Sequence, residues 1–231
     1  MSASATGVLL QMFYDPKAAF ESTLARTRSW LPLLAVTLGS AALLFWYFRT
    51  VDFTWLFNHM LAGMPDADEA QREAIRTGLS PAVITWGGLV SVMLTVPATA
   101  AMFGLYYLLA AKFVGNDIGF KKWFGFGAWI MVPRLLVLPL MALQIVSSGG
   151  QVGMEDLSMV TLNYLVLHLA PGHPWAGLAG SVDLTVLWTI ALSVVGLRVW
   201  TGRALATCVT ISLLPWLLIY GAWAAKIVAF S

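Results

Sequence analysis

The chain has 231 residues, of which 59% are hydrophobic and only 10% are charged, with a net charge of +2 and a mean hydropathy of +0.81. Soluble domains carry about 25% charged residues, so this composition indicates an integral membrane protein. The small net charge, without a basic run that contains interleaved aromatic residues, argues against a nucleic-acid partner. The single cysteine, Cys208, excludes an internal disulfide framework and a cysteine-rich metal site.

Residues 1–29 are predicted to form an amphipathic segment at the membrane surface. Asp15 and Pro16 have the form of a helix N-cap followed by proline at the first helical position. The apolar face of the helix that follows would contain Ala19, Phe20, Thr23 and Leu24. A helix with such a face can lie along the headgroup boundary, and the alternative is a plain solvated leader. Because the segment has no basic signal-peptide region, targeting falls to the first span.

Five stretches are apolar and long enough to cross a bilayer, which needs about 20 helical residues. They cover residues 30–48, 82–111, 123–146, 178–200 and 205–230. The sequence therefore predicts an all-α integral membrane bundle of five transmembrane helices, residues 30–231, preceded by the amphipathic interfacial helix.

Two of the connections between spans are predicted to contain short helices. In the first outer loop, Asp66 and Glu69 match a capping box, which predicts a surface helix over 67–77 that ends near Gly78. In the third loop, the apolar segment from Leu157 to Leu169 is too short to span the membrane. We expect this segment to be an interfacial or re-entrant helix.

Small residues recur at every fourth position in three of the spans. The stripes are Gly87, Ser91, Thr95 and Thr99 in the second span; Gly177, Ser181, Thr185, Thr189 and Ser193 in the fourth; and Gly221, Ala225 and Ala229 in the fifth. Small residues at this spacing let two helix backbones approach closely, so the stripes predict packing seams. A transport path along the second span is the alternative.

The distribution of Lys and Arg predicts the orientation, because these residues favour cytoplasmic loops. With the N-terminus inside, the inner segments hold Lys17, Arg26, Arg28, Lys112, Lys121, Lys122, Arg198 and Arg203. The outer segments hold Arg49, Arg72, Arg76 and Lys226, together with most of the acidic residues. We therefore expect a multi-pass protein of the plasma (inner) membrane with a cytoplasmic N-terminus and an outside C-terminus.

Arg134 lies in the middle of the third predicted span, between Pro133 and Pro139. A charge at the bilayer centre costs about 2.5–3.5 kcal/mol on insertion scales, so it needs a partner or a purpose. Asp183 in the fourth span is one candidate partner, and such a pair would suggest a charged switch or a substrate contact. Alternatively, the guanidinium binds carbonyls that lose their N–H partner at the two prolines, which is an architectural role.

No catalytic, cofactor or metal site is predicted. The sequence contains no G-x-S-x-G motif, phosphate-binding loop or dinucleotide fingerprint. His59, His168 and His173 lack the spacing of a metal site, although the last two share a loop with Glu155 and Asp156. Gly125 and Gly127 are interpreted as helix-packing glycines rather than a phosphate cradle.

Three segments show a resemblance to a known family: MFYDPKAAFESTLARTRSWLPLL before the first span, FGFGAWIMVPRLL in the third, and DLTVLWTIALSVVGLRVWTGRALATCV across the fourth and fifth. They resemble the bacterial branch of the Yip1 family of multi-pass membrane proteins, and Pro133 matches the family pattern. The resemblance implies a five-helix bundle with a cytoplasmic N-terminus. Eukaryotic relatives are implicated in vesicle trafficking and bind small prenylated GTPases.

These observations together lead to two functional hypotheses. The first is a non-enzymatic scaffold or membrane-organising accessory protein, in contact with the lipid bilayer and with a partner membrane protein or further copies of itself. The second is a small transporter or channel subunit in which Arg134 contacts an anionic substrate or a lipid headgroup.

Overall fold

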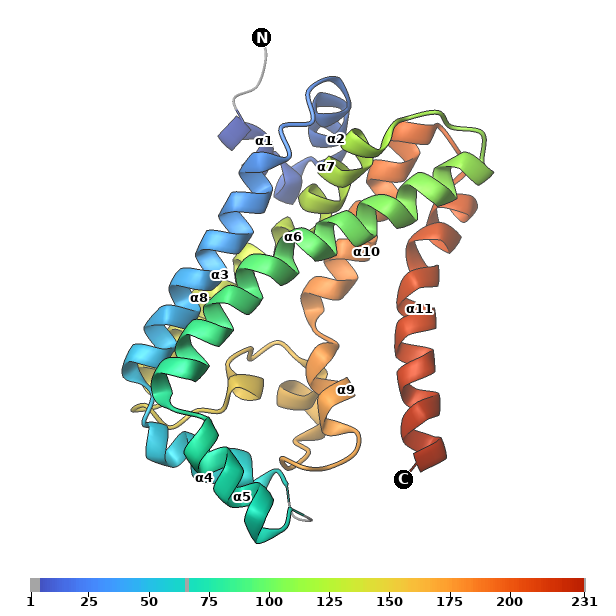
Figure 1. The fold of residues 1–231 in the computed structure, drawn as a ribbon. Coiled ribbons are helices and arrows are strands. Elements are labelled where there is room, and N and C mark those ends of the chain that lie inside the picture. Colours follow the sequence, from blue (N-terminus) through green and yellow to red (C-terminus); the bar gives the residue numbers. More distant parts are fainter. Residues whose placement is uncertain (1–4, 65–66, 231) are drawn as a thin grey trace. The chain divides into compact units, whose positions relative to one another are not determined.

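The structure is a computed structural model that describes residues 5–64 and 67–230, and the described chain is all-α (Figure 1). Five helical stretches are long and apolar enough to cross a membrane. They are Trp30–Thr50 (α3), Pro81–Phe113 (α6), Phe120–Ser147 (α7 to α8), Leu184–Thr201 (α10) and Leu205–Phe230 (α11). The predicted all-α bundle with five candidate spans is therefore confirmed.

The chain divides into two compact units, which are described one at a time. Unit 1 comprises Met1–Gly39, Met93–Leu135 and Thr185–Ile219. Unit 2 comprises Ser40–Val92, Leu136–Leu184 and Tyr220–Ser231. The sequence-distant segments of each unit pack around its own hydrophobic core.

The N-terminal segment forms two helices of unit 1, α1 (Ala5–Tyr14) and α2 (Pro16–Ala25). The predicted cap is confirmed, because the Asp15 carboxylate accepts a hydrogen bond of 3.2 Å from the Ala18 N–H, and Pro16 is the first residue of α2. The side chains of Ala19, Phe20 and Thr23 are buried in the protein. Most of the face that the sequence pattern assigned to the membrane surface thus packs on unit 1, and its interfacial position stays a prediction.

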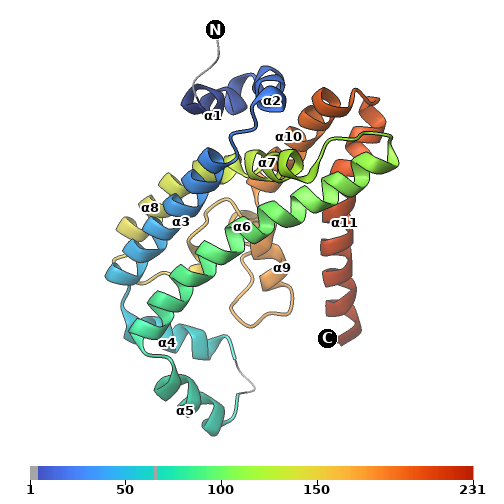
Figure 2. The same ribbon diagram turned by 45° about the horizontal axis from the view of Figure 1, so that its top comes forward.

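Aromatic side chains from four helices form the centre of unit 1, where α2 lies beside α7 (Figure 2). The Phe126 ring of α7 (Phe120–Ile130) lies 5.4 Å from Phe20, 4.9 Å from Tyr107 and 5.0 Å from Trp200, measured between ring centroids. The Trp200 indole N–H also donates to the Phe20 carbonyl at 3.1 Å. Edge-to-face ring contacts make such a cluster stable, so the N-terminal helices are part of the fold of unit 1.

Close helix contacts in unit 1 depend on glycine. A Cβ atom added to Gly104 of α6 would lie 2.7 Å from the Phe124 Cα atom. A Cβ atom on Gly127 would collide with the Ala100 carbonyl oxygen, and one on Gly125 would collide with the Thr27 side chain. The interpretation of Gly125 and Gly127 as packing glycines is confirmed.

The first loop of unit 2 differs from the prediction. It contains α4 (Phe53–Ala62), which the sequence analysis missed, and α5 (Glu69–Gly78). The capping box of α5 is formed by Asp68 and Gln71. The proposed Asp66–Glu69 box is wrong in register, since Glu69 is the first helical residue, and Asp66 lies outside the described residues. Glutamine completes the box as well as glutamate does.

The fourth span starts six residues later than predicted, at Leu184 instead of residue 178. The preceding residues form a separate short helix, α9 (Ala176–Ser181). Between α9 and α10 the backbone is extended and pairs with the third loop, because the Leu162 N–H donates to the Val182 carbonyl at 2.7 Å. An extended pair of this kind interrupts the helix.

The segment from Leu157 to Leu169 is not the expected helix. The part after Leu162 is a single π-helical turn, η3 (Asn163–Leu167), which ends at His168 in the left-handed conformation. The Asn163 side chain closes this turn by accepting from the Leu169 N–H at 2.9 Å and donating to the Leu169 carbonyl at 3.3 Å. Hydrogen bonds of the Asn163 side chain therefore replace helical hydrogen bonds here.

Packing on α6 uses a different helix face from the predicted seam. Gly87, Ser91 and Thr95 are exposed, and a Cβ atom on Gly87 would meet nothing within 4 Å. The buried face instead consists of Val96, Ala100, Phe103, Gly104, Tyr107 and Ala111. Of the other two stripes, the fourth-span stripe is buried at Thr189 and Ser193, whereas Gly221, Ala225 and Ala229 are exposed. Only the fourth-span stripe therefore packs within the chain as a seam.

Candidate functional site

The centre of the third candidate span is a break between two helices. α7 ends at Ile130, a 3-10 turn follows over Val132–Leu136 (η1), and α8 runs from Val137 to Ser147. Arg134 lies in this turn with its side chain exposed, and its backbone N–H donates to the Met131 carbonyl at 3.1 Å. The sequence located the charge correctly but did not predict that the helix stops on both sides of it.

Both prolines beside Arg134 lie at helix boundaries. Pro133 comes after the end of α7, and Pro139 is the third residue of α8. The first N–H groups of a helix have no intrahelical acceptor, so neither proline removes a bond from a continuous helix. The Trp129 carbonyl, one turn before Pro133, already accepts from the Met131 N–H.

The architectural explanation for Arg134 stays a prediction. Among the described residues of unit 1, the Arg134 guanidinium makes no hydrogen bond or ion pair. Asp183 belongs to unit 2 and directly precedes α10, and its backbone forms an antiparallel bridge with Thr161. It lies outside the helix in which it was predicted. Pairing between Arg134 and Asp183 stays a prediction.

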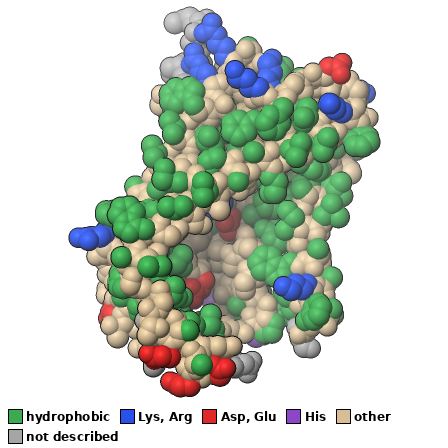
Figure 3. Space-filling view, viewed as in Figure 1, with side chains coloured by type: hydrophobic (Ala, Val, Ile, Leu, Met, Phe, Trp, Pro, Cys, Tyr) green, Lys and Arg blue, Asp and Glu red, His purple; other side chains and the backbone are tan. Residues whose placement is uncertain are grey.

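In unit 1, hydrogen bonds link the loop between α6 and α7 to the loop between α10 and α11 and the adjoining end of α10. This end of the unit is rich in Lys and Arg. The Asn116 amide, between α6 and α7, donates to the Trp200 carbonyl at 3.2 Å, and Arg203, between α10 and α11, donates to the Val114 carbonyl. The exposed cations of these connections and the adjoining helix ends are Lys112, Lys121, Lys122, Arg198 and Arg203, and their acid is Asp117. Figure 3 shows Lys and Arg side chains gathered over this end of unit 1.

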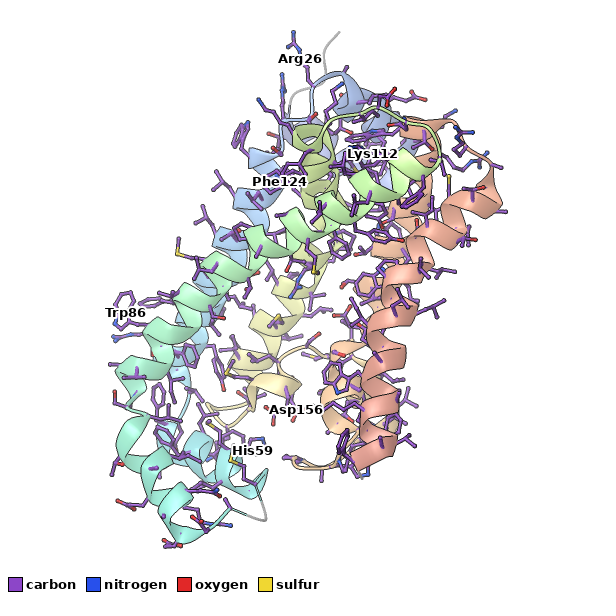
Figure 4. The ribbon with its side chains drawn as sticks, turned by 45° about the vertical axis from the view of Figure 1, so that its right-hand side comes forward. Arg26, His59, Trp86, Lys112, Phe124 and Asp156 are labelled. Atoms are coloured by element: carbon purple, nitrogen blue, oxygen red, sulfur yellow. The ribbon has the colours of Figure 1, made fainter. Side chains whose placement is uncertain are left out.

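In unit 2, a hydrogen bond between side chains joins α4 to the third loop. The His59 Nε2 atom lies 2.5 Å from the Glu155 Oε1 atom, although the residues are 96 positions apart, and the His59 ring stacks on Trp55 at 4.7 Å. Asp156 points to the same region as His59 (Figure 4). Burial and the neighbouring Glu155 carboxylate raise the pKa of Asp156, while His59 opposes this change.

This cluster was not predicted from the sequence. The sequence analysis grouped Glu155 and Asp156 with His168 and His173, whereas the structure brings His59 to Glu155. No spacing signal could have found a contact made by tertiary folding alone. Among the described residues, no group of three or more His, Cys, Asp or Glu side chains is placed to hold a metal ion.

The five apolar helical stretches define a multi-pass α-helical membrane protein. The model of the Yip1 domain matches residues 10–225, nearly the whole chain. The chain therefore belongs to the Yip1 family. No curated protein and no solved structure matches it.

Proposed function

We propose that this Yip1 family protein is a non-enzymatic scaffold or membrane-organising protein, which holds a partner membrane protein or another copy of itself in the bilayer. The observation that carries the proposal is the exposed face of α6. Gly87 and Ser91 lie on this face, one turn apart, and no other part of the described chain covers them.

Large apolar side chains flank these small residues. The exposed fractions are 64% for Trp86, 53% for Val90 and 66% for Leu94, and Trp86 points away from its helix in Figure 4. Small residues between large ones form a shallow groove that admits a second helix backbone, and such close approach drives helix association in membranes. The face therefore fits a transmembrane helix of a partner.

Cross-linking in native membranes tests this proposal. With Cys208 replaced by Ala, a cysteine at Val90 should cross-link to a partner or to a second copy, and Gly87→Leu with Ser91→Leu should abolish the product. The comparison variant is Gly221→Leu, because that glycine also has nothing within 4 Å but lies on α11. The proposed interface on α6 is contradicted if the cross-link survives the α6 changes. It is also contradicted if Gly221→Leu removes the cross-link equally.

We also propose that the basic end of unit 1 is cytoplasmic, which places the N-terminus inside the plasma (inner) membrane and the C-terminus outside. Excess Lys and Arg in short loops is the main determinant of orientation. The outer connection between α3 and α6 carries most of its charge as acids, including Asp68, Glu69 and Glu73. A reporter enzyme that is active only outside the membrane should be active when fused after Phe230 and inactive when fused after Asn116.

A transporter or channel subunit is the second candidate, and the exposed Arg134 favours it. A charge at the break of a span typically faces a water-filled cavity or a substrate. Anion flux through reconstituted protein should then fall strongly in Arg134→Ala and be retained in Arg134→Lys. Flux that is unchanged in Arg134→Ala contradicts this version.

A further inference from the structure

The C-terminal half of α6 and the N-terminal half of α11 enclose an apolar groove in unit 1. Its volume is about 670 Å³, and its walls include Leu109, Phe113, Ala206, Thr210 and Leu214. Figures 1 and 2 both show these two helix halves side by side. The volume lies within the range of about 300–1,000 Å³ that is typical of small-molecule sites.

A hydrogen bond between the helices fixes the width of the groove. Pro215 has no N–H group, so the Ile211 carbonyl, one turn earlier in α11, lacks its intrahelical donor. The Tyr106 hydroxyl of α6 donates to this carbonyl at 2.6 Å. Tyr106 and Ile211 both line the groove, so the site is formed before any ligand arrives.

The mouth of the groove is positively charged. Arg203 donates to the carbonyl of Val114, which is itself a lining residue, and the rest of its guanidinium has no other partner among the described side chains of unit 1. The first turn of α11 includes the lining residue Ala206. Its backbone N–H groups precede the first intrahelical hydrogen bond, so they have no acceptor in the helix and favour a bound anion.

An apolar groove with a cationic mouth complements an anionic phospholipid. We propose that the groove between α6 and α11 holds one acyl chain of such a lipid, while Arg203 binds its phosphate. Both walls belong to candidate spans, so the occupant comes from the bilayer. Basic pockets between transmembrane helices are known to bind anionic headgroups. The site lies away from the exposed α6 face around Gly87 and does not rest on the scaffold function.

Lipid retention by the full-length protein tests the proposal. The protein is equilibrated in vesicles of phosphatidylcholine mixed with phosphatidylglycerol, extracted in mild detergent, and the bound lipids are quantified by mass spectrometry. We expect the wild type to enrich phosphatidylglycerol over the bulk mixture. Arg203→Gln should reduce this enrichment about fivefold.

Two further variants separate the groove from general surface charge. Thr210→Trp fills the groove without changing a charge and should also remove the enrichment. Lys17→Gln removes an exposed cation on α2 and should leave the enrichment unchanged. The proposal is overturned if the wild type retains both lipids in the supplied ratio, if Lys17→Gln is as harmful as Arg203→Gln, or if the groove is found to hold a second copy of the chain.

Discussion

Gly104 provides the sharpest test of the packing in unit 1. A Cβ atom at this position would lie 2.7 Å from the Phe124 Cα atom, 2.8 Å from the Phe124 nitrogen and 3.1 Å from the Trp123 carbonyl carbon. All three atoms belong to the backbone of α7, so no side-chain rotation can relieve the collision. In Gly104→Ala, α6 and α7 must therefore move apart.

The magnitude follows from two opposing effects. Overpacking costs typically about 1–3 kcal/mol, and a rigid backbone neighbour places this site at the upper end. Alanine returns up to about 1 kcal/mol through its higher helix propensity. We expect a net loss of about 2 kcal/mol, which lowers Tm by about 4–8 °C for a chain of this length.

Thermal unfolding in mild detergent, followed by circular dichroism, measures this change. Gly221→Ala is the matched control in a helix, because a Cβ atom there meets nothing within 4 Å. The control should unfold at the wild-type temperature or slightly above it. The packing argument is refuted if Gly104→Ala unfolds no earlier than Gly221→Ala.

Three other changes have defined outcomes. Tyr106→Phe leaves the Ile211 carbonyl without its donor and should cost about 1–2 kcal/mol in the same unfolding assay, whereas a wild-type Tm would show that the bond contributes nothing. Asn163→Ala should accelerate amide exchange over residues 163–169, and unchanged exchange there would contradict its role in closing the π-helical turn. The raised pKa of Asp156 stabilises the folded state below the ordinary value of 3.8, and this stabilisation is lost as pH rises through the raised pKa. Asp156→Asn should therefore flatten the dependence of Tm on pH in the acidic range, and an undiminished slope would show that another group controls it.

The sequence predicted those features that depend on local composition. Each span was found because about 20 consecutive apolar residues have few alternatives to a membrane helix. The cap of α2 was predicted correctly, because Asp15 and Pro16 act on residues only a few positions away. The sequence did not identify the α6 face that packs within the chain, since Gly87 and Gly88 are adjacent and only the contact of Gly88 with Phe48 in the fold distinguishes them.

The features that were missed arise from contacts distant in the sequence. The fourth span begins late because Val182 pairs with Leu162, and no apolar pattern encodes that backbone pairing. The break around Arg134 was indicated only by its flanking prolines, which were interpreted as freeing backbone carbonyls within one span. The His59–Glu155 pair joins residues that share no local motif. Tertiary contacts thus determined the register of the helices and the composition of the charged clusters.

The molecular mass of the protein in mild detergent tests the scaffold proposal most directly. Light scattering on the wild type should give the mass of a homo-oligomer or of a stable complex with a partner membrane protein. Gly87→Leu with Ser91→Leu should give a 25.1 kDa monomer that keeps the helical circular dichroism of the wild type. A wild type that is already monomeric and carries no partner, or a variant that keeps the full complex, would contradict the account.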